Sequence, residues 1–358
     1  MTTHDLGTVK LDILPYRLRF KRPFGTAHGL RDGTDSVLVR LREGGLVGYG
    51  EATTPPYVSE NQSGIISTYR SIDPQAIESS DLKSMSRSLD QLLDGRAMPA
   101  ARAGLHMAFM DLILRKMNGD ASALGLIEEP GQGVGVFTLG ISTLNELDAK
   151  LNEASDAPVL KIKLNGRPED GETLRWISGR TERPLLLDAN QGLTTVDQAL
   201  GMIAAAGGAM RVAGLEQPFH KDDLETHAAL SRRTTVPVIA DESVQGPEDL
   251  EERGWAFTGV NVKLMKCGGL DRALDMIRWA RSKGLHVMLG SMSESSLGCA
   301  AMASLGGLAD LCDLDGPWLI ANDPFRGFVL VNGRYRSLGR TGFGVEPVDG
   351  LFDDPIGT

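Results

Sequence analysis

The sequence predicts an α/β protein whose main part is a barrel of parallel strands. From about residue 135 onward, short strand-like segments alternate with helical ones, which is typical of a parallel sheet. We expect eight strands over about 180 residues, which fits a small closed (β/α)8-type barrel, with an open doubly wound sheet as the alternative. The predicted strands are 135–141, 159–164, 185–190, 214–218, 238–243, 259–264, 286–291 and 311–315.

The first part of the chain follows a different pattern. Residues 9–20 and 35–42 alternate apolar and polar side chains, and a Gly44-Gly45 turn leads into residues 46–52, so a small antiparallel sheet is expected. Apolar residues at helical spacing predict helices here and between the barrel strands. The main predicted helices are 63–71, 82–93, 99–117, 170–181, 195–206, 269–283 and 295–305.

The last part of the chain contains a hairpin signal. Asn332-Gly333 lies between two short alternating segments within residues 328–338, and this dipeptide favours a type I′ turn. A lone hairpin is only marginally stable, so we expect the tail to fold back on the N-terminal sheet.

Composition excludes several classes of function. The formal net charge of −10 disfavours nucleic acid and membranes as partners, because both need a basic face. Cys267, Cys299 and Cys312 are odd in number and lack CxxC spacing, so neither a disulfide framework nor a zinc ribbon is expected. No apolar run approaches the length of about 18 residues that a transmembrane helix needs. The N-terminus lacks the regions of a signal peptide, and we therefore expect a cytoplasmic protein.

Five of the predicted barrel strands end in a charged residue. In chain order these residues are Lys163, Asp188, Glu216, Asp241 and Lys263, separated by 25, 28, 25 and 22 residues, or one βα unit each. The active site of a barrel enzyme lies at the carboxyl ends of its strands. We therefore expect the five side chains to meet at one mouth of the barrel.

The three acids have the chemistry of a site for a hard divalent cation. Neighbouring strands are about 4.8 Å apart, so Asp188, Glu216 and Asp241 can converge on one ion. The donors are all oxygen atoms, without His or Cys, which favours one Mg²⁺ per subunit, or Mn²⁺, over Zn²⁺. The alternative for any single acid is a helix cap or an ion pair.

The two lysines have the chemistry of proton-transfer groups. In an eight-stranded barrel the second and sixth strands are opposite, so Lys163 and Lys263 face one another with the acids between them. A lysine base needs its pKa lowered from about 10.4 to about 7–8, and a nearby cation or second lysine acts in that direction. The alternatives are that both lysines only pair with the acids, or that Lys266 is the catalytic group in place of Lys263.

The set of residues resembles the enolase superfamily, in its muconate-lactonising subgroup. The motifs that carry the resemblance are Lys161-Ile162-Lys163, Asp188-Ala189-Asn190, Glu216-Gln217-Pro218, Asp241-Glu242-Ser243, Lys263 with Gly268-Gly269, and Gly48-Tyr49-Gly50-Glu51-Ala52. They cover nearly the whole chain, and the ordered set is far more specific than any one motif. The resemblance implies an α+β capping domain (1–130), a modified TIM barrel, (β/α)7β (131–324), and a C-terminal tail (325–358) that returns to the capping domain.

One further motif narrows the class of substrate that the resemblance implies. Asp313 and Asp315, in LCDLDGP, resemble the DxD motif of dipeptide epimerases. They share a strand face, and the eighth strand is opposite the strand of Glu216. The resemblance implies a dipeptide substrate whose carboxylate binds the metal and whose ammonium group reaches the Asp pair. The alternative is that the two acids cap a helix or pair with Arg326.

The resemblance also implies an isomerase reaction, the inversion of the α-carbon of the dipeptide's C-terminal residue. Either Lys163 or Lys263 removes the α-proton, the metal stabilises the resulting enolate, and the other lysine returns a proton to the opposite face. Lys161 is expected to contact the carboxylate or enolate oxygen. Asn190 and Lys266 are expected to support the site.

Loops at the barrel mouth are expected to select the side chains of the substrate. Residues 24–31 (FGTAHGLR), which include His28, match the front loop that closes over the substrate in the family. The other expected substrate contacts are Thr138, Ser291, Met292 and Ser293. Arg22 and Arg31 lie near the front loop, and the sequence leaves open whether the second residue of the dipeptide is acidic or apolar.

Two rival functions stay open. An N-acylamino acid racemase or o-succinylbenzoate synthase of the same superfamily shares the lysines and the metal site but leaves the Asp pair without a role. A catalytically silent barrel that binds a small molecule is the rival from another class. The resemblance also implies a homo-oligomer.

Overall fold

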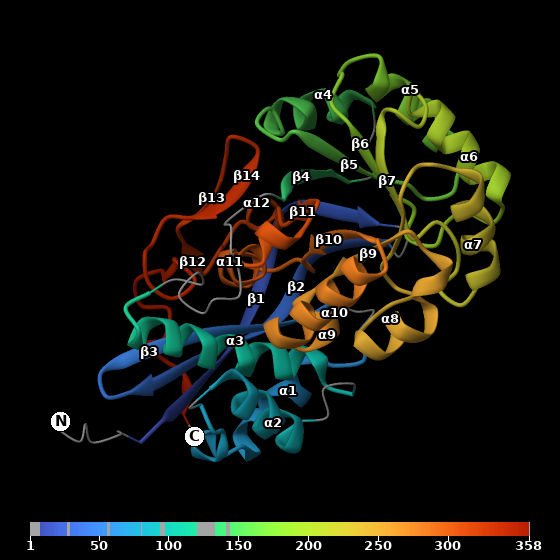
Figure 1. Cartoon of the computed structure of the whole chain (residues 1–358). Coiled ribbons are helices and arrows are strands. Elements are labelled where there is room, and N and C mark those ends of the chain that lie inside the picture. The colour runs from blue at the N-terminus through green and yellow to red at the C-terminus, as the bar shows by residue number, and fades with distance from the viewer. Residues whose placement is uncertain are drawn as a thin grey trace.

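Eight parallel strands close into a barrel in the computed structural model, which describes residues 8–26, 29–55, 58–79, 81–93, 97–119, 133–140 and 144–357 (Figure 1). The order around the barrel is β10-β11-β4-β5-β6-β7-β8-β9, so β5 is opposite β9 and β7 is opposite β11. These strands are β4 (Val134–Leu139), β5 (Val159–Lys163), β6 (Leu185–Asp188), β7 (Val212–Glu216), β8 (Val238–Ala240), β9 (Gly259–Val262), β10 (His286–Gly290) and β11 (Leu311–Asp313). Each predicted barrel segment overlaps one of them, and the open-sheet alternative is wrong.

Helices surround the barrel because the strands are apolar on both faces. Inward-facing side chains such as Val136, Leu186 and Ile239 form a small cluster of their own, while outward-facing ones join the main core under the helices. Side-chain caps start three of these helices, at Thr195, Asp223 and Ser295. The helices are α4 (Leu144–Glu153), α5 (Glu169–Ser178), α6 (Val196–Ala205), α7 (Leu224–Arg233), α8 (Pro247–Arg253), α9 (Leu264–Cys267), α10 (Leu270–Ser282), α11 (Ser296–Ala303) and α12 (Gly316–Leu319).

An antiparallel sheet with the order β16-β1-β2-β3 forms the cap. Its strands are β1 (Lys10–Thr26), β2 (Gly29–Glu43), β3 (Leu46–Thr54) and β16 (Ile356–Gly357), and its helices are α1 (Gln62–Ser71), α2 (Leu82–Leu92) and α3 (Pro99–Lys116). Gly48 and Gly50 let β3 approach α3, since a Cβ atom there would lie 2.3 Å from Ala108 O and 2.0 Å from Gly104 O. β1 and β2 also pair through most of the predicted front loop.

The hairpin of the C-terminal tail forms as predicted but packs against a different part of the protein. β13 (Phe328–Val331) and β14 (Arg334–Ser337) form the predicted hairpin, with positive φ angles of 51° at Asn332 and 71° at Gly333. The hairpin lies against the barrel instead of the N-terminal sheet, because Gly135 N donates to Gly333 O (2.8 Å). The short strand β12 (Phe325–Arg326) pairs with β15 (Glu346–Pro347). Of the tail strands that the structure describes, only β16 pairs with β1.

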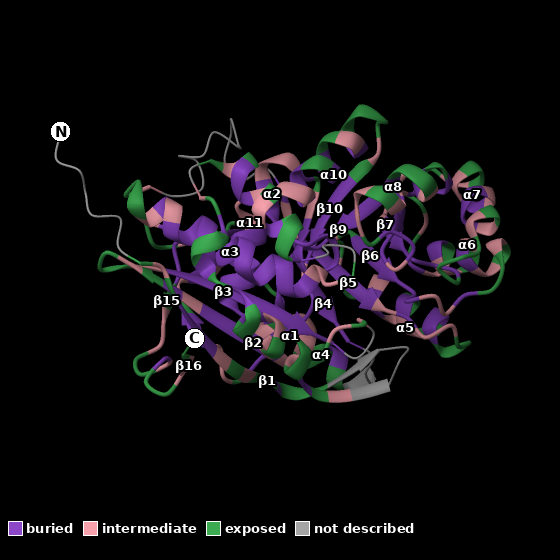
Figure 2. Ribbon diagram, turned by 90° about the horizontal axis from the view of Figure 1, so that it is seen from below, coloured by how far each residue is buried: buried purple, intermediate pink, exposed green. Residues whose placement is uncertain are grey.

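A buried arginine joins the cap to the barrel. Arg102 of α3 is fully buried, and its guanidinium donates to Asp90 (2.8 Å), to both oxygens of Asp271 on α10 (2.8 and 3.0 Å) and to Gly268 O (2.7 Å). Figure 2 shows α3 and the barrel strands as largely buried, whereas the outer faces of the barrel helices are exposed. Among the helices that the structure describes, none is long and apolar enough to cross a membrane.

Candidate active site

The charged residues at the strand ends meet at one mouth of the barrel. Lys163, Asp188, Glu216 and Asp313 are the last residues of β5, β6, β7 and β11, and Asp241 and Lys263 directly follow β8 and β9. Parallel strands end at the same edge, so the topology brings these six side chains together. A larger cavity of about 1140 Å³ lies between α2 and α10, but it is lined by none of the predicted site residues.

Lys161 is at the centre of the charge cluster. Its Nζ lies 2.6 Å from both Glu216 and Asp313, on opposite sides of the barrel, and 3.0 Å from Asp188. Burial opposes the charged amine, but the three carboxylates outweigh it and raise the pKa of Lys161 well above its ordinary value. Lys161 is therefore a buried cation that holds the mouth together, whereas the sequence predicted only a contact with the substrate.

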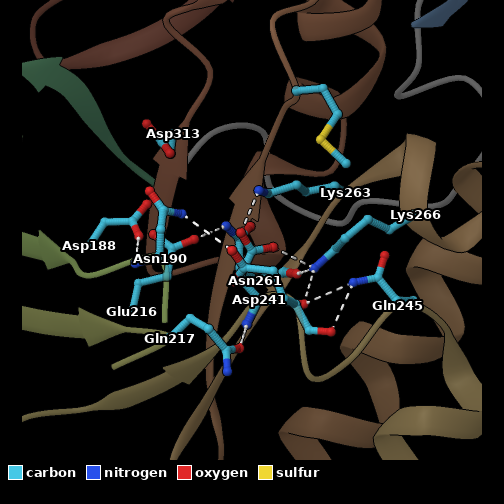
Figure 3. A network of polar contacts seen from close by, with 12 residues as sticks. Asp188, Asn190, Glu216, Gln217, Asp241, Gln245, Asn261, Lys263, Lys266 and Asp313 are labelled. Atoms are coloured by element: carbon cyan, nitrogen blue, oxygen red, sulfur yellow. Dashed lines mark hydrogen bonds and ion pairs between the residues drawn. The ribbon is translucent and has the colours of Figure 1, made fainter. Parts of the chain in front are cut away.

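The other three lysines each contact a carboxylate, and Figure 3 shows Lys263 and Lys266 beside Asp241. Lys163 Nζ contacts Asp188 (2.6 Å) and Asn190 Oδ1 (3.3 Å), and Lys263 Nζ contacts Asp241 (2.8 Å). Both line the cavity at the mouth. Lys266 is not among the residues that line it, and its Nζ donates to Asp241 Oδ1 (2.7 Å), Asp241 O (2.8 Å) and Asn261 O (2.8 Å). Three acceptors use all of its protons, so Lys266 is anchored as a structural cation.

The Asp pair faces the cavity and is anchored by the first barrel strand. Asp315 accepts a hydrogen bond from Thr138 N (2.6 Å), and Asp313 accepts one from Thr138 Oγ1 (3.2 Å). Asp315 precedes α12 without capping it through its side chain, and no ion pair to Arg326 occurs among the described contacts. Burial and the neighbouring Asp313 raise the pKa of Asp315 to about 7, which a bound ammonium group would reverse.

A cavity of about 70 Å³ lies above these side chains. The predicted residues that line it are Thr138, Lys161, Lys163, Asn190, Asp241, Lys263, Ser291, Met292, Ser293, Asp313 and Asp315. Asp188 and Glu216 are completely buried beneath it, and His28 lies outside the described residues. Arg31, Glu242 and Leu319 also line the cavity, although no role was predicted for Glu242 or Leu319.

Two amides that hold the carboxylates were missed in the sequence. Asn261 Nδ2 donates to Glu216 Oε1 (2.7 Å), and Gln217 Oε1 accepts from the backbone N–H groups of Asp241 (2.9 Å) and Ser243 (3.0 Å). Asn261 is two residues before Lys263, so the period of a strand could have placed it on the same face. Gln217 has a positive φ of 36°, which the sequence does not reveal.

The carboxylate oxygens at the mouth fit a divalent cation in chemistry and charge. Six carboxyl groups (Asp188, Glu216, Asp241, Glu242, Asp313, Asp315) lie here with four lysines (161, 163, 263, 266) and Arg31, which leaves one negative charge if all are ionised. Glu216 Oε2 is buried and accepts no hydrogen bond among the described residues, although Lys161 lies near it as an ion-pair partner. Burial and the neighbouring Asp188 raise the pKa of Glu216 to about 8. This agrees with a site in which carboxyl groups outnumber basic side chains.

The lysines lie where a metal would have to bind. In the described part of the chain, no three acidic, His or Cys side chains are grouped closely enough to hold an ion as they lie. Asp188, Glu216 and Asp241 are the residues that would hold the ion, and each has an oxygen in contact with a lysine. Since all three acids contact a lysine within 3.0 Å, a cation and these ammonium groups compete for the same oxygens.

Comparison with known proteins places the chain in a family. Residues 146–350 match the family "Enolase C-terminal domain-like", and residues 9–124 match "Mandelate racemase / muconate lactonizing enzyme, N-terminal domain". The chain belongs to the enolase superfamily. It is 33% identical over 341 residues to the L-Ala-D/L-Glu epimerase of Bacteroides thetaiotaomicron, covering 95% of this chain and 88% of that protein. This confirms the resemblance inferred from the motifs.

Solved structures of superfamily members show the same fold. The dipeptide epimerase of Enterococcus faecalis, in complex with Mg and L-Leu-L-Tyr, has a TM-score of 0.83 and 26% identity, and the match covers 96% of this chain and all (100%) of the other. The N-succinyl Arg/Lys racemase of Bacillus cereus has a TM-score of 0.86 at 22% identity, covering 98% and 97% of the two chains, which shows the fold alone. The protein is therefore an enolase-superfamily member similar to dipeptide epimerases.

Proposed function

We propose that the protein is a dipeptide epimerase that inverts the α-carbon of the C-terminal residue by 1,1-proton transfer. The observation that carries the proposal is the pair of cavity-lining lysines on opposite strands, β5 and β9, with the carboxylates between them. Such a pair can reach the two faces of one carbon atom. The Asp pair on β11 and the similarity to L-Ala-D/L-Glu epimerase favour a dipeptide as the substrate.

The substrate is oriented by its two charged ends. Asp188, Glu216 and Asp241 are the residues that would hold Mg²⁺, which when bound neutralises the substrate carboxylate and the charge that develops as the α-proton leaves. Asp313 and Asp315 bind the ammonium group at the other end. With both ends fixed, the α-carbon of the second residue lies between Lys163 and Lys263.

Proton transfer then needs only the two lysines. One neutral amine takes the α-proton and becomes an ammonium group, and the opposite ammonium group gives a proton to the other face of the planar carbon. Lys163 serves one epimer as the base and Lys263 serves the other. Lys266, anchored by its three acceptors, keeps Asp241 in position without exchanging a proton.

The second residue of the dipeptide is the part that the cap selects. Arg31 lines the cavity, whereas Arg22 makes a peripheral ion pair with Glu153 (2.8 Å, both more than half exposed). The position of Arg31 supports an acidic second residue. Met292, which also lines the cavity, supports the apolar alternative.

A rival reaction within the superfamily has one observation in its favour. Asp313 is already paired with Lys161 at 2.6 Å, which leaves less of its charge for a substrate ammonium group. An N-acylamino acid racemase or o-succinylbenzoate synthase would not need that charge. The same lysines would serve such a reaction.

A deuterium-uptake screen tests the proposal against its rivals. The protein is incubated in D₂O with Mg²⁺ and a dipeptide library, and mass spectrometry follows uptake at the α-carbon, with EDTA as the control. We expect Mg²⁺-dependent uptake into dipeptides. Uptake only into N-succinyl amino acids would overturn the substrate assignment, and no uptake into either class would favour a catalytically silent barrel.

A further inference from the structure

A second cavity joins the mouth of the barrel on the side of the Asp pair. It has a volume of about 420 Å³, compared with about 70 Å³ for the cavity above the lysines. Thr138 and Leu319 line both, so the two are neighbours. The remaining walls come from α4, α12 and the segment of β1 around Pro23. We call this space the side cavity.

The side cavity lies where the side chain of the first residue would be if the Asp pair held the substrate ammonium group. In a dipeptide, that nitrogen is bonded directly to the α-carbon of the first residue. An ammonium group held by Asp313 and Asp315 therefore places the first side chain beside Thr138, whose N–H and hydroxyl bind those acids. The side cavity adjoins Thr138 and has room for a large side chain.

The walls of the side cavity are apolar and held in place. Phe137, Trp318 and Leu319 are among the apolar residues that line it. The Trp318 ring is packed against Phe328 (centroids 6.0 Å apart) and Tyr335 (5.5 Å) of the tail hairpin. Because the Trp318 ring is already held in position, it loses little conformational entropy when a ligand binds. This favours contact between its ring and an aromatic side chain.

The rim of the side cavity has an excess of positive charge. Lys21, Arg22 and Lys150 lie there with a single acid, Glu153, which is paired with Arg22 at 2.8 Å. Among the described residues that line the cavity, a cationic side chain would meet three basic groups and one carboxylate, that of Glu153, which is paired with Arg22. Such a rim discriminates by repulsion as well as by fit.

We propose that the side cavity binds the first residue of the dipeptide, and that it selects a large aromatic side chain over alanine and excludes lysine and arginine. The inference rests on the proposed dipeptide epimerase function and specifies its substrate class. The residues that determine this specificity are Trp318, Leu319 and Lys150.

A matched set of dipeptides tests the inference. Three dipeptides with the same second residue and Phe, Ala or Lys as the first are compared by the kcat/KM of α-deuterium exchange. We expect the order Phe, Ala, Lys, with about tenfold or more between neighbours, the usual effect of filling or mismatching a binding pocket. A rate that does not depend on the first residue, or is highest for Lys, overturns this inference alone. No exchange with any dipeptide overturns the proposed function too.

Two variants separate recognition from general damage. Lys150→Glu reverses one rim charge, and we expect it to raise the Lys-first to Phe-first ratio by about tenfold. Lys283→Glu, at an exposed lysine beside Trp279 on α10, is the matched control and leaves the ratio unchanged. Trp318→Leu should lower exchange of the Phe-first dipeptide about tenfold more than that of the Ala-first one. If Lys150→Glu leaves the Lys-first to Phe-first ratio unchanged and Trp318→Leu leaves the Phe-first to Ala-first ratio unchanged, the side cavity does not discriminate between first residues.

Discussion

The barrel mouth and the contact between α3 and α10 both bury charged side chains, but they use them differently. At the contact, Arg102 has an acceptor on each of its three nitrogens, and its partners belong to both the cap and the barrel. At the mouth, one lysine is shared by three carboxylates, and two further lysines face a cavity. Completed pairing stabilises a structure, whereas incomplete pairing leaves charges available for a ligand.

The pKa values at the contact agree with this difference. Burial lowers the pKa of His106, so this ring is neutral at neutral pH despite lying 3.2 Å from Asp271. Burial opposes ionisation of Asp271, but the pKa of that carboxyl is nevertheless held well below its ordinary range. The neighbouring His106 and the hydrogen-bonded guanidinium of Arg102 favour the ionised form of this carboxyl. At the mouth, by contrast, the pKa of Glu216 is raised.

The largest expected effect is the loss of one direction of proton transfer at the mouth. Lys163→Ala and Lys263→Ala should each lower α-proton exchange by about 10²–10⁴-fold for one epimer only, since each lysine serves one face. The measurement is deuterium exchange of both epimers in D₂O. Native rates for both epimers in both variants would show that the lysine mechanism is wrong.

At the contact, the expected effect is on stability. Arg102→Met should lower the free energy of unfolding by about 3–5 kcal/mol, because it leaves Asp271 and Asp90 without their partner. Denaturant unfolding measures this change, and exchange activity of the folded fraction should be nearly unaffected. Arg233→Met, which removes an exposed pair with Asp197 (2.9 Å), is the control and should cost at most about 1 kcal/mol. Equal losses in the two variants would contradict the comparison.

A buried neutral group behind the mouth should make stability depend on pH. Burial lowers the pKa of His227 to about 4, and its Nε2 faces Gln217 Nε2 (3.3 Å) and Phe219 N (3.4 Å), which are donors. The unfolded chain takes up this proton below about pH 6.5 but the folded chain only near pH 4. The free energy of unfolding should therefore fall by up to about 3 kcal/mol as the pH falls through that range.

The His227 contribution is isolated by comparing variants across pH. His227→Gln should have a shallower pH dependence of unfolding between pH 6.5 and 4 than the wild type. His220→Gln, at an exposed histidine near Asp222, should have the wild-type slope. If the slope of His227→Gln equals that of the wild type, His227 is not the titrating group.

The smallest expected effect concerns the two arginines near the front loop. Arg31→Gln should lower kcat/KM about tenfold for a dipeptide with an acidic second residue, which corresponds to about 1.4 kcal/mol. Arg22→Gln removes an exposed ion pair with Glu153 and one charge at the rim of the side cavity. It is the control, and holding the first residue of the dipeptide as alanine keeps that rim charge out of the comparison. An equal response of the two variants would remove the argument for an acidic second residue.

The sequence predicted the barrel well because one repeated pattern specifies it. Five successive βα units place a charged residue at the end of a strand, so Lys163, Asp188 and Glu216 could be assigned to one mouth before any contact was known. The hairpin at Asn332-Gly333 was also predicted, since two positive φ angles favour that dipeptide. Its packing partner was not, because an alternating strand shows that a face is buried but not against what.

By itself, the sequence determined the order of the charges around the barrel, and with it a chemistry of acids flanked by two opposed lysines. Only the tertiary structure decided how those charges pair. Lys161 reaches across the barrel to Asp313, Lys266 is saturated by three acceptors, and Asn261 and Gln217 hold the carboxylates in place. Strand period and spacing fix the face on which a side chain lies, whereas hydrogen-bond partners depend on distances of a few tenths of an ångström between elements far apart in the chain.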